Sequence, residues 1–176
     1  MVIILFAGFV VYSIYPIIFF NANIEVIPAP ASLIHTVTLG ALLSLSGASA
    51  SLGESEEAGL KIALRDVNES FKRTNTNLGV GLIIEDTHTD PSFGIEELKD
   101  LASKGIRIVI GPSTSAELEA IKDYANNNGI ILLSPSSTAP LLATPGDNIF
   151  RLVPDDTHQA EAIATQMRKD GIRVVM

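Results

Sequence analysis

The chain has 176 residues, of which 47% are hydrophobic and 18% charged, so it can fold around a sizeable core and is too apolar to be disordered. Its 12 Lys and Arg against 20 Asp and Glu give a net charge of −8, which argues against a nucleic-acid-binding surface. It contains no cysteine, which excludes disulfides, thiolate catalysis and cysteine-based zinc sites.

Residues 1–20 form an apolar segment without a single charge, and the first basic residue of the chain is Lys61. As a helix this segment would span roughly 30 Å, which is near the thickness of a bilayer core. The missing positive n-region favours an uncleaved membrane anchor over a cleaved signal peptide. A buried core helix and mistranslated upstream sequence are the remaining alternatives. Residues 21–34, which contain two prolines, are expected to be an extended linker.

Strand and helix patterns alternate from residue 35 onward. The pattern predicts a strand over 35–43, a small-residue loop over 45–53, and a helix over 54–71. Ser51 and Glu54 have the spacing of a capping box at the start of that helix, whose early acidic residues suit the positive end of the helix dipole. The predicted buried stripe of this helix consists of Leu60, Ala63, Leu64, Val67 and Phe71.

A second strand is predicted over 79–85, followed by a helix that starts at the Asp90-Pro91 pair and runs to about residue 104. Gly105 is expected to end this helix. Its predicted buried residues are Ile95, Leu98 and Leu101.

The next strand–helix–strand unit carries a hydroxyl-rich loop after each of its strands. The strands are predicted over 106–110 and 130–133, and the loops that follow them are 111–115 (GPSTS) and 134–138 (SPSST). Between them lies one amphipathic helix, with Thr114 and Glu117 at capping-box spacing and Gly129 at its end.

The last part of the chain contains a short extended segment over 149–152, predicted as a crossing, and a helix that begins near Asp156. A strand is predicted over 172–176. The residues expected to face inward from the last helix are Ala160, Ile163, Ala164 and Met167.

This alternation predicts an α/β fold: an open parallel sheet with helices on both faces, preceded by the apolar N-terminal helix. Carboxyl ends of parallel strands meet at one edge of such a sheet, where open α/β sheets bind ligands. The loops 111–115 and 134–138 are therefore predicted to form half of a small-molecule binding site. Because Ser and Thr also cap helices and form turns anywhere, a purely structural role for these loops is the alternative.

Six segments in fixed order resemble one protein family. No single one is decisive, and their order and spacing carry the likeness. They are Gly40–Gly53 (GALLSLSGASASLG), Ala58–Asn68 (AGLKIALRDVN), Glu85–Pro91 (EDTHTDP), Ile110–Ser115 (IGPSTS), Gly129–Thr138 (GIILLSPSST) and Phe150–Ala160 (FRLVPDDTHQA).

The chain thereby resembles the N-terminal portion of type I periplasmic solute-binding proteins, in the branched-chain amino-acid (Leu/Ile/Val) branch of ABC importers. The resemblance implies two α/β lobes with the ligand between them, lobe one over 35–153 and the start of a truncated lobe two over 154–176. It also implies ligand contacts: the Ser115 hydroxyl, a main-chain group of Ser136 and the Thr138 hydroxyl. Leu52 lies where some members place an aromatic residue over the ligand.

The residues give independent reasons for such contacts. Loop 111–115 precedes a helix N-terminus, where free N–H groups and the helix dipole favour an anion, and the hydroxyls of loop 134–138 can accept from an ammonium group. Asp86 and Asp90 are interpreted as a strand-end residue and a helix cap rather than as a metal site. The scattered histidines His35, His88 and His158 lack metal-ligand spacing.

The expected function is capture of an amino acid or related small polar solute outside the cytoplasm and its delivery to an ABC permease, with membrane attachment through residues 1–20. No cofactor, metal or nucleic acid is expected. No enzymatic activity is expected either, because nucleophile-elbow and P-loop motifs are absent. Two alternatives remain: the ligand-binding ectodomain of a membrane sensor, and a gene fragment without activity of its own.

Overall fold

The computed structural model describes residues 35–142 and 144–173. The predicted apolar helix over 1–20 and the linker over 21–34 lie outside this part and stay predictions. None of the helices in the described part is both long enough and apolar enough to span a bilayer.

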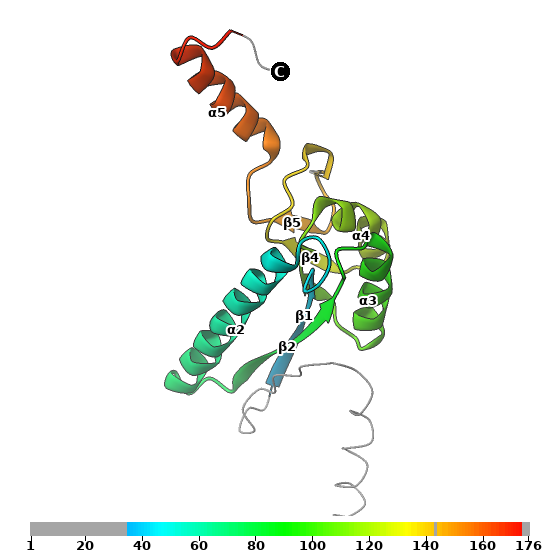
Figure 1. Cartoon of the computed structure of the whole chain (residues 1–176). Helices are drawn as coiled ribbons and strands as arrows, with labels where there is room; N and C mark the ends of the chain where they lie inside the picture. Colours follow the sequence, from blue (N-terminus) through cyan, green and yellow to red (C-terminus); the bar gives the residue numbers. More distant parts are fainter. Residues whose placement is uncertain (1–34, 143, 174–176) are drawn as a thin grey trace, which may run out of the picture.

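The described residues form one open sheet of five parallel strands (Figure 1). An open parallel sheet is the architecture that the sequence predicts. Their order across the sheet is β2-β1-β3-β4-β5, so β3 lies in the middle and β1 lies between β3 and the edge strand β2. The strands are β1 (His35–Leu43), β2 (Leu78–Asp86), β3 (Ile108–Ile110), β4 (Ile131–Ser134) and β5 (Ile149–Arg151).

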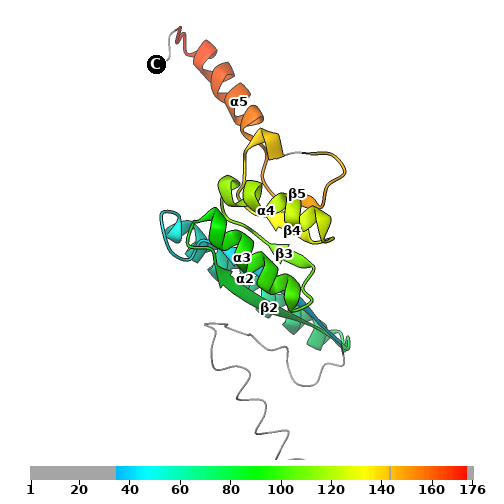
Figure 2. The same ribbon diagram turned by 90° about the vertical axis from the view of Figure 1, so that its right-hand side faces the viewer.

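Helices connect the strands and lie on both faces of the sheet. Figure 1 shows α2 on one face and α3 with α4 on the opposite face, and Figure 2 shows α3 and α4 side by side in front of the strands. The helices are α2 (Ala50–Arg73), α3 (Pro91–Ser103), α4 (Ser115–Asn127) and α5 (Asp156–Lys169), with a short 3-10 helix over Pro140–Leu142.

Side chains that alternate along the strands build a separate core on each face. In β1, Leu42 belongs to the larger core, whereas its neighbours Ala41 and Leu43 belong to the smaller one with Leu64 of α2. This alternation is the period-two pattern of a strand covered on both faces. The larger core also contains the buried residues Leu98, Leu101, Ile106, Val109, Leu118, Ile121, Ala125, Ile130, Leu132 and Leu142.

Helix α2 starts four residues before its predicted start, so the residues predicted to cap it lie inside the helix. Its cap residue is Ser49, whose side chain makes no capping hydrogen bond, so the capping box predicted for Ser51 and Glu54 is wrong. The first turn contains no acidic residue, because the helix begins at Ala50 and the glutamates lie further along it. Of the predicted stripe, Leu64 is the only residue that is buried.

The caps predicted for α3 and α4 are confirmed. The Asp90 carboxylate accepts the Ser92 N–H at the start of α3, and Thr114 with Glu117 forms a complete capping box on α4. Gly105 and Gly129 follow these two helices with φ of +82° and +63°, which is the left-handed backbone that glycine adopts at helix ends.

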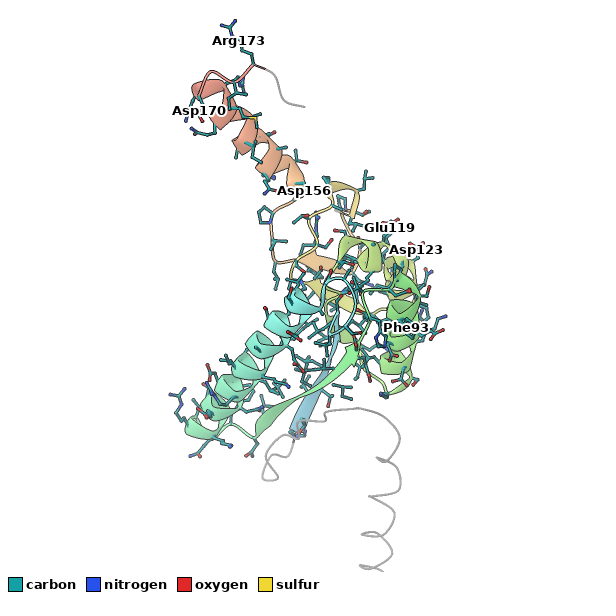
Figure 3. The ribbon with its side chains drawn as sticks, in the orientation of Figure 1. Phe93, Glu119, Asp123, Asp156, Asp170 and Arg173 are labelled. Carbon is teal, nitrogen blue, oxygen red and sulfur yellow. The ribbon has the colours of Figure 1, made fainter. Side chains whose placement is uncertain are left out.

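The C-terminal segment differs from its prediction in two ways. Residues 149–151 are not a free crossing but pair with β4 as a fifth strand, and Phe150 on this strand is 53% exposed. Helix α5 is capped by Asp155. It projects away from the sheet, and Figure 3 labels Asp156 at its start and Asp170 just beyond its end. None of its residues is buried, so the inward stripe predicted for it has nothing to pack against among the described residues.

Candidate functional site

The carboxyl edge of the sheet gathers hydroxyls and carboxylates from segments far apart in the sequence. Ser44 follows β1, Thr87 follows β2, and the loops 111–115 and 134–138 follow β3 and β4. The strands are parallel and directly paired, so these segments emerge side by side. The buried polar residues of the described chain are all of this kind: Ser44, Thr87, Ser113, Glu117, Ser134 and Ser137.

Glu117 of α4 joins three of these segments, although its side chain is fully buried. Its carboxylate accepts the hydroxyl of Ser44 at 3.1 Å, the hydroxyl of Thr87, and both the N–H (3.0 Å) and the hydroxyl of Thr114. A buried carboxylate is tolerated where several donors replace its hydration, and the helix dipole at this end of α4 favours the negative charge. The sequence shows Glu117 only as half of a capping box; its bonds to Ser44 and Thr87 require the fold.

The two hydroxyl-rich loops contact one another, as predicted. The hydroxyls of Ser115 and Ser137 lie 2.9 Å apart, and the Ser134 hydroxyl donates to the Pro112 carbonyl at 3.1 Å. The Ser136 hydroxyl lies 2.5 Å from the Ser113 carbonyl oxygen and 2.8 Å from Oε1 of Glu56 on α2. Helix α2 and the two loops therefore converge on this part of the edge.

The remaining predicted site residues lie at the border of this cluster. The Thr138 carbonyl accepts the Asp156 N–H at 3.0 Å, and no hydrogen bond of the Thr138 hydroxyl is found within the described residues. Thr138 also lines an open pocket of about 390 Å³ together with the segment that leads into α5. Leu52 lies in the first turn of α2 and is 40% exposed.

An apolar pocket of about 160 Å³ lies elsewhere, between α2 and the sheet, and contains none of the predicted site residues.

The aspartates Asp86 and Asp90 have the structural roles predicted for them. Asp90 caps α3, and Asp86 accepts the N–H groups of Leu45 (2.9 Å), Ser46 (3.1 Å) and His88 (2.8 Å) with one carboxylate oxygen. Burial tends to raise the pKa of Asp86, but the hydrogen bonds from His88 and Ser46 outweigh it, so the pKa lies below its ordinary value. Asp86 thus fastens the loop after β1 to the end of β2.

A group of three carboxylates, Glu85, Glu97 and Asp100, lies close enough together to share a cation. The ammonium group of Lys104 already pairs with two of them, at 3.0 Å from Glu85 and 2.5 Å from Asp100. Burial opposes the charge on Lys104, but these bonds raise its pKa. The group is therefore an ion-pair network on the α3 side of the sheet.

Comparison with known proteins places this architecture in a family. The model of the periplasmic binding protein family matches residues 36–176. An uncharacterized protein of Methanocaldococcus jannaschii is 34% identical over 148 residues, which cover 81% of this chain and 36% of that protein. The chain belongs to the periplasmic binding protein family.

Solved structures of similar fold extend the comparison. A branched-chain amino acid transporter substrate-binding protein of Streptococcus pneumoniae, in complex with isoleucine, matches with a TM-score of 0.64 at 23% identity, covering 69% of this chain and 35% of that one. An ABC transporter substrate-binding protein of Desulfitobacterium hafniense, in complex with Leu, matches at 0.65 and 26%, covering 77% and 39%. A solute-binding protein of Rhodopseudomonas palustris, in complex with 3,4-dihydroxybenzoic acid, matches at 0.66 and 14%, covering 78% and 37%.

These coverages define how much of a relative the chain represents. It spans little more than a third of the length of the proteins it matches. The predicted resemblance is confirmed, and so is the predicted fold of the first lobe.

Proposed function

We propose that the chain provides the first ligand-binding lobe of an extracytoplasmic solute-binding protein, which captures an amino acid or related small polar solute for an ABC permease. The observation that carries this proposal is the meeting of the loops after β3 and β4, where the hydroxyls of Ser115 and Ser137 lie 2.9 Å apart. Proteins of this family with the same fold hold isoleucine or Leu in their complexes.

The chemistry of the edge suits the two charged ends of an amino acid. At the start of α4, the backbone N–H groups of Ser115 and Ala116 have no acceptor within the described residues, and a helix N-terminus with free N–H groups favours a carboxylate. The hydroxyls of Ser136 and Thr138 can accept from an ammonium group. Leu52 would give the pocket an apolar wall. The role is binding without chemistry, so the lobe needs no nucleophile or general base.

The second wall of the site is proposed to come from a second lobe, which residues 154–176 would begin. The exposed face of α5 supports this division, because a helix with no buried residue has no core of its own. Ligand capture would then proceed by hinge closure of two lobes. The apolar residues 1–20 would hold the protein at the outer face of a membrane. Expression in a bacterial host with and without these residues, followed by membrane fractionation, tests this attachment.

A titration of the isotope-labelled chain with L-leucine, followed by NMR, tests the binding site. We expect weak, millimolar binding, because one lobe supplies only part of the contacts, and shifts confined to loops 111–115 and 134–138. Ser115→Ala or Thr138→Ala should weaken binding by about 1–3 kcal/mol through unpaired polar groups, whereas Ser103→Ala on α3 should not. Shifts that avoid both loops, or the same affinity in all variants, would show that these loops are structural.

A further inference from the structure

A single carboxylate on α2 contacts both loops of the candidate site. Glu56 accepts the Ser113 hydroxyl at 2.5 Å with Oε2 and the Ser136 hydroxyl at 2.8 Å with Oε1. The partners are 57 and 80 residues away along the sequence. Glu56 is half-buried, and each of its two oxygens points to a different loop.

The contacts continue into the buried part of the edge. The Ser113 hydroxyl, while donating to Glu56, accepts the N–H of Ser44 at 3.1 Å. Ser44 in turn donates its own hydroxyl to Glu117. A continuous chain of hydrogen bonds therefore runs from α4 through the end of β1 to α2 and the loop after β4.

We propose that Glu56 is a positioning residue for the ligand site: its carboxylate holds the loop after β3 and the loop after β4 in one arrangement before the ligand arrives. The functional meaning of this role rests on the proposed function, whereas the loop fastening itself does not. Holding polar groups in place before binding removes the entropy cost of ordering them at the moment of binding.

A carboxylate makes these two bonds stronger than a neutral group would. A carboxylate only accepts, and each of its oxygens takes a charge-assisted bond from one hydroxyl. Glutamine at this position has one acceptor oxygen and presents an N–H₂ group to the other hydroxyl. The Ser136 hydroxyl can accept from this N–H₂ group while it donates to the Ser113 carbonyl, so Glu56→Gln reverses the direction of one contact and removes the charge assistance from both.

The first test is amide hydrogen exchange in the ligand-free full chain. The reporters are the amides of Thr114 and Ser137, which donate to the Glu117 carboxylate and to the Ser134 hydroxyl, and the reference is the core amide of Leu132. Glu56→Gln is expected to speed exchange at both reporters by about fivefold, leaving Leu132 unchanged. The matched control, Glu54→Gln, changes the same charge on an exposed position of the same helix and should alter neither.

Unchanged reporters in Glu56→Gln, or equal acceleration of Leu132, would overturn the proposal. Should Glu56→Gln fail to fold, Ser136→Ala removes the contact with Glu56 together with the contact with the Ser113 carbonyl. It should speed exchange at Thr114 as well as at Ser137, because both contacts join the two loops. An effect restricted to Ser137 would contradict the shared fastening. In the double variant Glu56→Gln with Ser136→Ala, the two effects on amide exchange should be less than additive. Full additivity would also contradict the proposal.

The second test separates this inference from the proposed function, using L-leucine as the probe. If the natural chain binds L-leucine, Glu56→Gln should raise the dissociation constant by about fivefold, as expected when a preorganised site must first be ordered. Equal affinity in both proteins would refute the positioning role while leaving the binding function in place. If the natural chain binds no L-leucine but the exchange result holds, the loop fastening stands and the choice of ligand fails.

Discussion

The hydroxyl of Ser44, at the end of β1, donates to the carboxylate of Glu117 on α4 at a distance of 3.1 Å. Both residues are fully buried, and the same carboxylate also accepts from Thr87 and Thr114. Strand β1, its neighbour β2 and the helix that carries the candidate site are therefore fixed to one another at a single point.

Replacement of Glu117 by alanine should destabilise the fold strongly. The variant leaves Ser44, Thr87 and Thr114 without their acceptor inside the protein, and we expect the free energy of unfolding to fall by about 2–4 kcal/mol. Urea denaturation measures this change. Glu119→Ala on the exposed side of the same helix, where Glu119 pairs with Lys122, should cost less than about 0.5 kcal/mol (Figure 3). Similar losses in the two variants would show that the buried network contributes little.

Two glycines of α2 should respond in opposite directions to alanine. At Gly53 an added Cβ would lie 2.2 Å from the Ser44 carbonyl oxygen, so Gly53→Ala must push the helix from the strand, at a cost of about 2–3 kcal/mol. At Gly59 an added Cβ meets nothing within 4 Å, so Gly59→Ala should stabilise the protein by about 0.5–1 kcal/mol through helix propensity. Thermal unfolding of both variants distinguishes the two effects. Stabilisation by both would mean that the α2–β1 contact is looser than the structure shows.

The acid sensitivity of the fold should depend on Asp86. Its pKa in the folded protein is lowered, so its contribution to stability is present above its ordinary value of 3.8 and is lost as the pH falls through the folded pKa. A protonated aspartate resembles asparagine. The difference in unfolding free energy between the natural protein and Asp86→Asn should therefore be constant above about pH 5 and shrink below about pH 4.

Urea denaturation of both proteins from neutral pH to acid measures the Asp86 effect. Asp66→Asn, an equal charge change on an exposed position of α2, serves as the control. A difference between Asp86→Asn and the natural protein that does not shrink in acid would contradict this assignment.

Asn68 should act as a clamp on the edge strand β2. Its side-chain amide donates to the Val80 carbonyl at 2.8 Å, and its oxygen accepts the Val80 N–H at 2.9 Å. Asn68→Ala removes both bonds and should lower the free energy of unfolding by about 1–3 kcal/mol. Asn68→Asp keeps the acceptor and loses the donor, so an intermediate loss is expected. Equal stability of all three proteins would show that water replaces the clamp without cost.

The sequence predicts the repeating part of this fold well because the signals are local. The apolar runs, the Asp90 cap and the Thr114–Glu117 box each act within a few residues, and the structure contains all of them. The start of α2 is missed because the residues before Glu54 are small and polar, which is typical of loops, while their helical state depends on the close approach of Gly53 to Ser44. Packing here outweighs intrinsic propensity.

The candidate site is predicted only in part, for the same reason. Loops 111–115 and 134–138 are recognisable because each follows an apolar strand, and their contact follows from parallel topology. Glu56 and Ser44 carry no such signal, since a glutamate on a helix and a serine after a strand are usually solvated. Their roles depend on neighbours more than 50 residues away, which only the folded chain reveals.

Because α5 has no buried residue, its helical content should be sensitive to any surface that packs against it. Its order rests mainly on local terms, such as the Asp155 cap on Thr157 and the Gln166–Asp170 pair, each contributing about 0.3–1 kcal/mol. The Asp156 N–H also donates to the Thr138 carbonyl. A helix of 14 residues held mainly by such terms is marginally stable by itself. Any surface that packs on it shifts the balance between helix and coil, so the helical content of residues 156–169 is itself a measure of contact.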